Sequence, residues 1–390
     1  MLLLSAAFGG TGDSIFFEAA KELDFLALDS LRSNPEETEF ISGLRLVSMG
    51  QLSSAVSVFR ELYHAANDST MKENSQKILG SLYLFYSEWD SLSILGIPDD
   101  DENAISLINS FRLLPPERYI FPKDSIIIPM RLSISGAPII EVEINGNKRR
   151  FWLDTGAGLS VLSSDAAMDC GVVALSSAEA QALTSTSKKV GIQPVSIRKL
   201  KIGELEIENH PAMIIDSKNL EFRMLGLTFI KIDGIIGWNA IQNLDIKIDY
   251  LRKHITIKKP VIVPNASPSL FWLDYPIVTA AMSGETLYFF LDTGASRTGV
   301  YDNLFTKISF ENARKTAQIV GGAGGMERFE AVKVPALDIS VNGRNVALKN
   351  VTSYPHHDAG FIKLDGVLGA DAFKGKRVHI DITNGAFEIY

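Results

Sequence analysis

The sequence is poor in cysteine, in long apolar runs and in excess positive charge. Cys170 is its single cysteine, which excludes an intramolecular disulfide and a zinc site built on cysteines. We interpret Cys170 as a small, semi-buried apolar residue. No stretch approaches the ~20 consecutive apolar residues of a membrane-spanning helix. With 38 Lys and Arg residues against 46 Asp and Glu residues, no basic surplus is available for a nucleic-acid backbone. We therefore expect neither a membrane span nor a nucleic-acid partner.

What the sequence does contain is typical of soluble globular proteins. Of its 390 residues, 46% are hydrophobic and 22% are charged, and this length predicts two or three compact units. The first residues, Met1–Gly10, are apolar and then small. Two interpretations stay open for residues 1–12, the remnant of a secretory signal or a disordered terminus. The first favours an extracytoplasmic location, periplasmic or secreted, over a cytoplasmic one.

Residues 13–118 have the apolar spacing of helices. Apolar residues recur at three- and four-residue intervals, most regularly over residues 44–65, where Gly50 marks a turn between two helices. Ala55 follows Gly50 by five residues and Phe59 by nine, a spacing that resembles the second half of a tetratricopeptide repeat. We predict an α-helical, tetratricopeptide-like domain. Whether it docks a protein partner, covers the rest of the chain or acts as a spacer stays open.

From Ile126 onward the pattern changes to short β-branched runs separated by Gly and Asn. Residues 139–144 and 150–153 flank Asn145-Gly146, which predicts a β-hairpin with a tight turn. The same style continues to the end of the chain, so this part is predicted to be mainly β.

An internal repeat divides the β-rich part into two copies. Residues 138–157 recur as residues 276–295, with a proline 16 residues before an Asp-Thr-Gly-Ala sequence in each copy. Two further blocks recur in the same order, Asp233-Gly-Ile-Ile-Gly237 as Asp365-Gly-Val-Leu-Gly369 and Ile246–Asp249 as His379–Asp381. A proline-rich linker, residues 258–268, separates the copies. We predict one lobe over residues 119–262 and a second over residues 263–390.

The repeat places one aspartate, Asp154 or Asp292, at the end of an apolar strand in each copy. Gly156 and Gly294 permit a tight reversal behind it. If the lobes pack about a pseudo-two-fold axis, the two carboxylates meet, and at short range they share one proton. One then activates a water as general base while the other acts as general acid. A single Asp-Thr-Gly would be an ordinary turn, but two copies at equivalent repeat positions indicate an acid–base pair.

These motifs give residues 122–390 a resemblance to the pepsin/retropepsin superfamily of aspartic peptidases. The resemblance implies a mainly β, bilobal acid-protease-like fold of two related β-barrel-like lobes, here preceded by the helical domain. It implies catalytic roles for Asp154 and Asp292, and hydrogen bonds that interlock Thr155 and Thr293 across the lobe interface. Alanine after the glycine is similar to the retroviral type, although both lobes lie in one chain as in pepsin. The other residues to which the resemblance assigns support of the pair are Gly156, Ala157, Gly294, Ala295, Ile235, Ile236, Gly237, Val367, Leu368 and Gly369.

Retroviral-type lobes close over substrate with glycine-rich flaps, and residues 320–326 are similar to such a flap. Its candidate substrate-binding residues are Gly321, Gly322, Gly324 and Gly325. The alternatives are a plain flexible loop and a phosphate cradle, but the following residues alternate like a strand instead of opening a helix. The equivalent region of the first lobe, residues 184–194, has a single glycine.

The sequence therefore predicts a metal-independent aspartic endopeptidase that acts on a peptide or protein substrate without a cofactor. His356-His357-Asp358 is the alternative metal-ligating cluster, but adjacent residues do not easily face one ion. Ala157 and Ala295 have no hydroxyl to stabilise a carboxylate, which predicts activity at mildly acidic to neutral pH and not near pH 3. Two other functions stay open, a non-catalytic peptide-binding protein on the same scaffold and a scaffold whose helical domain carries the function.

Overall fold

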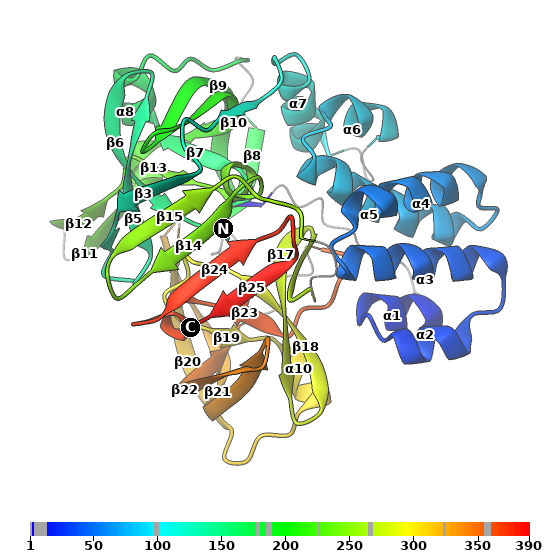
Figure 1. The fold of residues 1–390 in the computed structure, drawn as a ribbon. Helices are drawn as coiled ribbons and strands as arrows, with labels where there is room; N and C mark the ends of the chain where they lie inside the picture. Colours follow the sequence, from blue (N-terminus) through cyan, green and yellow to red (C-terminus); the bar gives the residue numbers. More distant parts are fainter. Residues whose placement is uncertain are drawn as a thin grey trace.

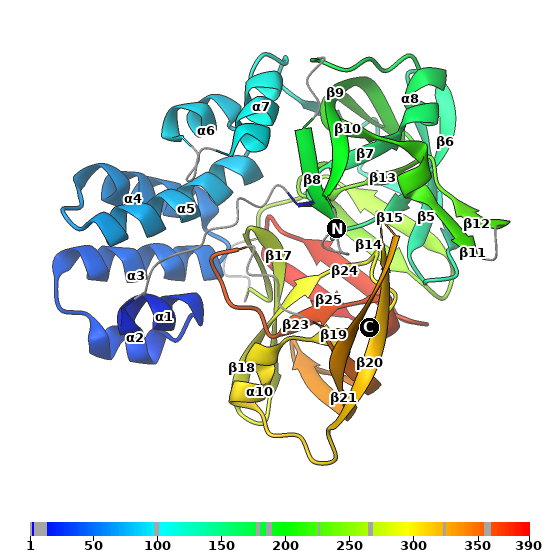
Figure 2. The same ribbon diagram turned by 180° about the vertical axis from the view of Figure 1, so that it is seen from behind.

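The computed structural model describes residues 2–3, 14–96, 101–176, 180–184, 189–224, 227–263, 268–322, 325–354 and 360–390. A helical region lies along one side of two β-rich lobes, in both views of the molecule (Figures 1 and 2). This arrangement confirms the predicted bilobal fold preceded by helices. Of the N-terminal stretch interpreted as a signal remnant, Leu2–Leu3 (β1) is described. None of the helices in the described ranges is both long enough and apolar enough to cross a bilayer.

Four helices of this region begin at a side chain that caps them. Asp24, Asn34, Asp68 and Asp101 each accept a hydrogen bond from a backbone N–H of the first turn that follows, which satisfies a donor that the helix itself leaves free. The helices of this region are α1 (Ile15–Lys21), α2 (Phe25–Leu31), α3 (Pro35–Ser48), α4 (Leu52–Ala65), α5 (Ser69–Phe85), α6 (Trp89–Leu95) and α7 (Glu102–Phe111).

The helix-turn-helix predicted over residues 44–65 is formed by α3 and α4. Gly50 has a φ of +69° in the turn, a conformation that glycine adopts at little cost. A Cβ built on Gly43 would lie 2.6 Å from the ring of Phe59, so this glycine lets the two helices pack closely. Phe40 and Phe59 are fully buried in an edge-to-face contact of 5.4 Å. The helices are confirmed, whereas their likeness to a tetratricopeptide repeat stays a prediction.

The first lobe is a sheet that closes on itself. Its strands follow the order β1-β8-β9-β10-β7-β13-β6-β5-β4, and β9 also pairs with β5. The predicted hairpin is present, with Asn145 and Gly146 at φ +48° and +90°. The elements are β2 (Arg118–Ile120), β4 (Arg131–Leu132), β5 (Pro138–Ile144), β6 (Asn147–Leu153), β7 (Ser160–Ser163), α8 (Ser164–Asp169), β8 (Ala180–Thr184), β9 (Lys189–Ile202), β10 (Leu205–Ile215), η2 (Ser217–Leu220), β11 (Glu221–Met224), β12 (Leu227–Lys231), β13 (Gly234–Ile236) and α9 (Trp238–Ile241).

The second lobe repeats this plan. Its order is β16-β17-β18-β23-β19-β22-β21-β20, closed by a pairing of β17 with β21. In both lobes a short strand lies parallel to the one that ends in the repeated aspartate, β13 beside β6 and β23 beside β18. The elements are β16 (Leu270–Leu273), β17 (Tyr275–Met282), β18 (Glu285–Leu291), β19 (Gly299–Val300), α10 (Asp302–Lys307), β20 (Arg314–Gly322), β21 (Gly325–Val341), β22 (Arg344–Ser353), β23 (Gly366–Leu368) and η3 (Ala370–Ala372).

A third sheet joins the lobes. It has the order β25-β24-β14-β15-β3, with β3 (Ser125–Pro129), β14 (Asp245–Asp249) and β15 (His254–Lys258) from the first lobe and β24 (Arg377–Asp381) and β25 (Ala386–Ile389) from the second. The third block of the internal repeat forms its centre, because β14 pairs with β24 in the register Ile246↔Ile380. The two copies of that block are thus hydrogen-bonded to each other between the lobes.

Candidate active site

The repeated strands deliver Asp154 and Asp292 to equivalent positions. Asp154 follows β6, and its N–H donates to Ile236 O of the parallel strand β13 at 3.0 Å. Asp292 follows β18, and its N–H donates to Leu368 O of β23 at 3.1 Å. The apolar residues behind each aspartate are buried. Each aspartate therefore begins a loop whose first backbone N–H is hydrogen-bonded to a buried neighbouring strand.

Thr155 and Thr293 join the two loops through reciprocal hydrogen bonds. Each hydroxyl accepts from the backbone N–H of the other threonine at 3.0 Å. Thr155 Oγ1 donates to Leu291 O at 2.7 Å, and Thr293 Oγ1 donates to Leu153 O at 2.9 Å. Both threonines are fully buried. These four bonds hold the ends of strands that lie 138 residues apart in the chain.

The carboxyl groups of Asp154 and Asp292 lie close together, each packed against the glycine of the opposite loop. A Cβ built on Gly156 would lie 2.5 Å from Asp292 Cγ, and one built on Gly294 would lie 2.4 Å from Asp154 Cγ. Gly156 N–H donates to Asp154 Oδ1 at 2.8 Å, while Gly294 and Ala295 N–H both donate to Asp292 Oδ1 at 2.8 Å. Backbone donors thus orient both carboxyl groups, and the two glycines leave room for them to meet.

The surroundings hold a proton on one member of this pair. Burial raises the pKa of Asp292, the negative charge of Asp154 raises it further, and the result is a value of about 7. The N–H of Ala295 opposes this shift only in part. Since two close carboxylates resist double ionisation, the pair carries a single negative charge over the mildly acidic range.

The apolar-apolar-Gly segments pack directly behind the aspartate loops. A Cβ on Gly237 would lie 2.5 Å from Leu159 C, and a Cβ on Gly369 would lie 2.5 Å from Arg297 C. Both contacts are with backbone, which cannot move aside as a flexible side chain can. Ile235, Ile236 and Leu368 are buried among the core residues. Any residue larger than glycine at either position would displace the loop that follows the aspartate.

A pair of polar residues that the sequence analysis missed fixes each loop from behind. In the first lobe Ser160 Oγ donates to Asn239 Oδ1 at 3.2 Å and accepts from Gly237 N–H at 3.1 Å. In the second, Thr298 Oγ1 donates to Asp371 Oδ1 at 2.7 Å and accepts from Gly369 N–H at 3.1 Å. The signal was available, because each hydroxyl stands six residues after its aspartate and each acceptor two residues after its glycine.

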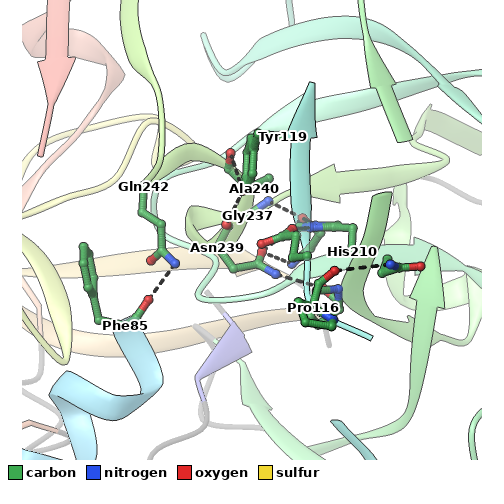
Figure 3. A network of polar contacts seen from close by, with 12 residues as sticks. Phe85, Pro116, Tyr119, His210, Gly237, Asn239, Ala240 and Gln242 are labelled. Carbon is green, nitrogen blue, oxygen red and sulfur yellow. Dashed lines mark hydrogen bonds and ion pairs between the residues drawn. The ribbon is translucent and has the colours of Figure 1, made fainter. Parts of the chain in front are cut away.

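The first lobe extends this contact to a buried histidine. His210 Nε2 lies 2.8 Å from Ser160 Oγ, and its Nδ1 is hydrogen-bonded to the carboxylate of Glu117. Asn239 Nδ2 also donates to Pro211 O at 2.8 Å, and Tyr119 Oη donates to Asn239 O at 3.0 Å. Figure 3 shows Tyr119 and His210, which come from separate parts of the chain, near Asn239 of α9. No spacing in the sequence indicates that residues so far apart are neighbours.

The glycine-rich segment named as a flap forms the end of a hairpin. Strands β20 and β21 pair up to Gly321↔Met326 and Gly322↔Gly325, whereas Gly324 lies outside the described residues. Near the middle of this hairpin the ring of Phe329 lies 6.0 Å from that of Tyr354. Burial raises the pKa of Tyr354, and the charges of Asp371 and Asp292 add to the shift.

The first lobe has a related hairpin formed by β8 and β9, which pair from Ala180↔Ile192 to Leu183↔Lys189. The predicted equivalent of the flap, residues 184–194, thus includes the start of β9, although residues 185–188 are not described. The alternative metal cluster His356-His357-Asp358 also lies outside the described residues.

One group of side chains in the described part of the chain has the geometry to hold a metal ion, Asp245, His379 and Asp381. It lies in the sheet between the lobes, and its polar atoms already have protein partners. His379 Nε2 is 2.8 Å from Asp245 Oδ1, and Asn384 Nδ2 donates to Asp381 Oδ2 at 2.6 Å. These contacts fit an interlobe hydrogen-bond cluster, to which we assign no metal.

Comparison with protein families gives two matches, one in each lobe. A family described as gag-polyprotein putative aspartyl protease matches residues 140–232, and a family described as aspartyl protease matches residues 278–372. Asp154 lies within the first range and Asp292 within the second. No curated protein matches the chain.

Proposed function

We propose, from the premise that this chain carries two retropepsin-like aspartyl protease domains in tandem, that it is an aspartic endopeptidase. Each lobe, residues 119–262 and residues 263–390, would contribute one aspartate to a single catalytic pair. The observation that carries the proposal is the approach of Asp154 and Asp292, each within 2.7 Å of the Cβ position of the opposite glycine. An endopeptidase substrate would be an extended peptide segment lying across both lobes.

The pair shares one proton, and we write the reaction with that proton on Asp292. Asp154 is the carboxylate that removes a proton from water, and the water oxygen attacks the carbonyl carbon of the peptide bond. Asp292 gives its proton to the carbonyl oxygen, which avoids a build-up of negative charge there. When the tetrahedral intermediate collapses, the leaving nitrogen takes a proton from the pair and the C–N bond breaks. The buried, singly protonated state supports this assignment because both groups then start in the form that the reaction needs.

The β20–β21 hairpin is the proposed flap of this enzyme. Gly321, Gly322, Gly324 and Gly325 would let its end bend over a bound peptide, since glycine lacks the side chain that restricts the backbone. Exposed Ile319 offers apolar surface on the same hairpin. Replacing Gly321 and Gly322 by alanine together tests this role, and we expect KM to rise more than kcat falls.

Peptide-library cleavage from pH 3 to pH 8 tests the proposed activity. We expect Asp292→Asn and Asp154→Asn each to lower kcat/KM by about 10²–10⁴-fold, the usual contribution of a general acid or base. Asp124→Asn, in the exposed turn before β3, is the matched control and is expected to cleave like the wild type. Cleavage by the wild type that survives in both aspartate variants would contradict the proposal.

The second candidate function, peptide binding without catalysis, has its own outcome in the same experiment. It predicts that the wild-type chain retains library peptides without cleaving them at any pH. The close approach of the two carboxyl groups favours catalysis, because a binding protein has no need to hold two such groups together.

A further inference from the structure

The helical region reaches the catalytic lobes through the C-terminal turn of α5. Gln242, directly after α9, donates from Nε2 to Phe85 O at 2.7 Å, as Figure 3 shows. From the second lobe, Trp272 Nε1 donates to Ser81 O at 3.3 Å and Asp274 N–H donates to Ser81 Oγ at 2.6 Å. One turn of helix thus receives hydrogen bonds from both lobes.

Aromatic rings from the same three parts of the chain pack together at this point. Trp238 of α9 stacks on Trp272 of β16 at 5.9 Å with an interplanar angle of 10°, and Phe85 of α5 lies 5.5 Å from Trp272. All three side chains are buried. Such a cluster excludes water from the hydrogen bonds beside it, which makes each of them costlier to lose.

The helix α9 is in turn hydrogen-bonded to the loop that carries Asp154. Trp238 N–H donates to Ala157 O at 2.6 Å and Asn239 N–H donates to Gly158 O at 3.1 Å. Ser160 N–H donates back to Asn239 Oδ1 at 2.9 Å. A continuous path of short, buried contacts therefore leads from α5 through α9 to the catalytic loop of the first lobe.

The helical region also contacts the segment behind Asp292. Lys307 Nζ lies 3.0 Å from Glu22 of the helical region and 3.0 Å from Asp365. Asp365 is fully buried and opens the Asp-Gly-Val-Leu-Gly segment, where its Oδ2 accepts from Tyr288 N–H at 2.8 Å. The helical region thus reaches the segment behind Asp292 through Lys307, as it reaches the segment behind Asp154 through Gln242.

We propose that the helical region is a positioning element of the catalytic centre and that Gln242 is the positioning residue through which α5 holds the loop of Asp154. The proposal rests on the proposed peptidase function for its kinetic consequences, but its structural consequence is independent of activity. The region then acts as part of the catalytic unit, and not as a separable docking module.

Gln242→Met tests the proposal, with Gln76→Met as matched control. Gln76 Nε2 donates to Leu95 O at 3.0 Å inside the helical region. The control therefore removes a hydrogen bond of the same type that does not involve α9. We expect Gln242→Met to lower kcat by about tenfold, which corresponds to ~1.4 kcal/mol, with KM nearly unchanged. Gln76→Met is expected to leave both constants within about twofold, since one such bond contributes little by itself. Equal kinetics for the two variants would overturn the proposal.

Gln242→Glu separates positioning from a general loss of stability. A protonated glutamic acid can donate to Phe85 O, whereas a glutamate cannot, and burial favours the protonated form. The ratio of variant to wild-type kcat is therefore expected to rise toward one as the pH is lowered from 8 to 5. A ratio that stays constant over this range contradicts the proposal. Because the comparison is made within one protein, it decides the question even if Gln242→Met does not fold.

Amide hydrogen exchange tests the positioning role without any measurement of enzyme activity. In Gln242→Met, amides of residues 154–160 are expected to exchange at least about tenfold faster than in the wild type, while Gln76→Met leaves them unchanged. Unchanged exchange in Gln242→Met overturns the positioning role. A wild-type chain that cleaves nothing but shows the expected exchange difference would instead reject the peptidase function and keep the positioning role.

Discussion

At the scale of single residues, the site depends on two threonine hydroxyl groups that each serve both lobes. Because each hydroxyl donates to one strand end and accepts from the opposite N–H, removing one leaves buried groups without partners. We expect Thr155→Val to destabilise the protein by about 2–6 kcal/mol, because Leu291 O and Thr293 N–H each lose a partner at a cost of about 1–3 kcal/mol per group. Urea denaturation measures the loss. Thr155→Ser keeps the hydroxyl and is expected to retain most of the stability, so a serine variant as unstable as the valine variant would contradict this account.

The raised pKa of Asp292 also predicts how stability depends on pH. A carboxyl group whose pKa is higher in the folded state than in the unfolded state binds protons more readily when folded, so folding stability falls as the pH rises from the unfolded value to the folded value. Here that window runs from about 4 to about 7.

Asp292→Asn removes this effect, so the variant is expected to melt several degrees above the wild type at pH 8. At pH 4 the two melting temperatures should nearly coincide, because Asp292 is then protonated in the wild type. Thermal denaturation across this range measures the difference. A gap that widens toward low pH would show that the sign is wrong.

At the scale of secondary-structure elements, the aspartate loops need glycine for space. A Cβ on Gly156 would overlap the carboxyl group of Asp292, so Gly156→Ala is expected to push the pair apart and lower kcat/KM by at least about 100-fold, as a displacement of about 1 Å can do. Gly80→Ala in α5 is the control, because its Cβ would meet nothing closer than 3.7 Å and alanine favours helix. Peptide cleavage and melting temperature distinguish the two. Normal activity in Gly156→Ala would contradict the observed packing.

Many of the secondary-structure elements could be predicted from the sequence, because the residues within each turn and strand largely determine them. Asn145-Gly146 predicted a hairpin and Gly50 a turn between helices, and both are present. The internal repeat predicted two related lobes, since similar blocks in the same order fold alike. These signals act over a few residues or are duplicated within the chain.

The contacts that support the site could not be predicted in this way. His210 meets Glu117 across 93 residues and Gln242 meets Phe85 across 157, and neither pair has a motif or an internal copy. The side-chain pair behind each loop, Ser160 with Asn239 or Thr298 with Asp371, had a repeated spacing but differing residue types. Long-range polar contacts are determined by the packing of whole elements, which composition and periodicity do not describe.

At the scale of the whole molecule, several contacts hold the lobes together, among them the stacking of Trp238 on Trp272. The threonine hydrogen bonds join them at the aspartate pair, the pairing of β14 with β24 joins them in the sheet between them, and the helical region binds both from outside. The last two are made outside the aspartate loops, so they fix the position of one lobe relative to the other independently of those loops. A catalytic pair shared between two lobes requires this, because a small shift between them separates the carboxyl groups.

The ion pair of His379 with Asp245 in this sheet should make the lobe contact depend on pH. Burial lowers the pKa of His379, but the hydrogen bond and charge of Asp245 outweigh it and raise the pKa. Burial raises the pKa of Asp245, and His379 outweighs that effect and lowers it. Glu388 also contacts His379 at 3.3 Å and adds to the upward shift.

Stability from the raised histidine pKa is fully present below the ordinary value of about 6.5, and stability from the lowered aspartate pKa is present above about 3.9. His379→Gln is therefore expected to cost most between about pH 4 and 6.5, by about 1 kcal/mol or less because the pair is partly exposed. The cost should shrink as the pH rises through the pKa of His379, since the wild-type imidazole then loses its charge. Chemical denaturation from pH 5 to pH 9 measures it, with His254→Gln on strand β15 of the same sheet as control. A cost that grows toward pH 9 would contradict the sign, and an equal cost in the control would assign the effect to the sheet and not to the ion pair.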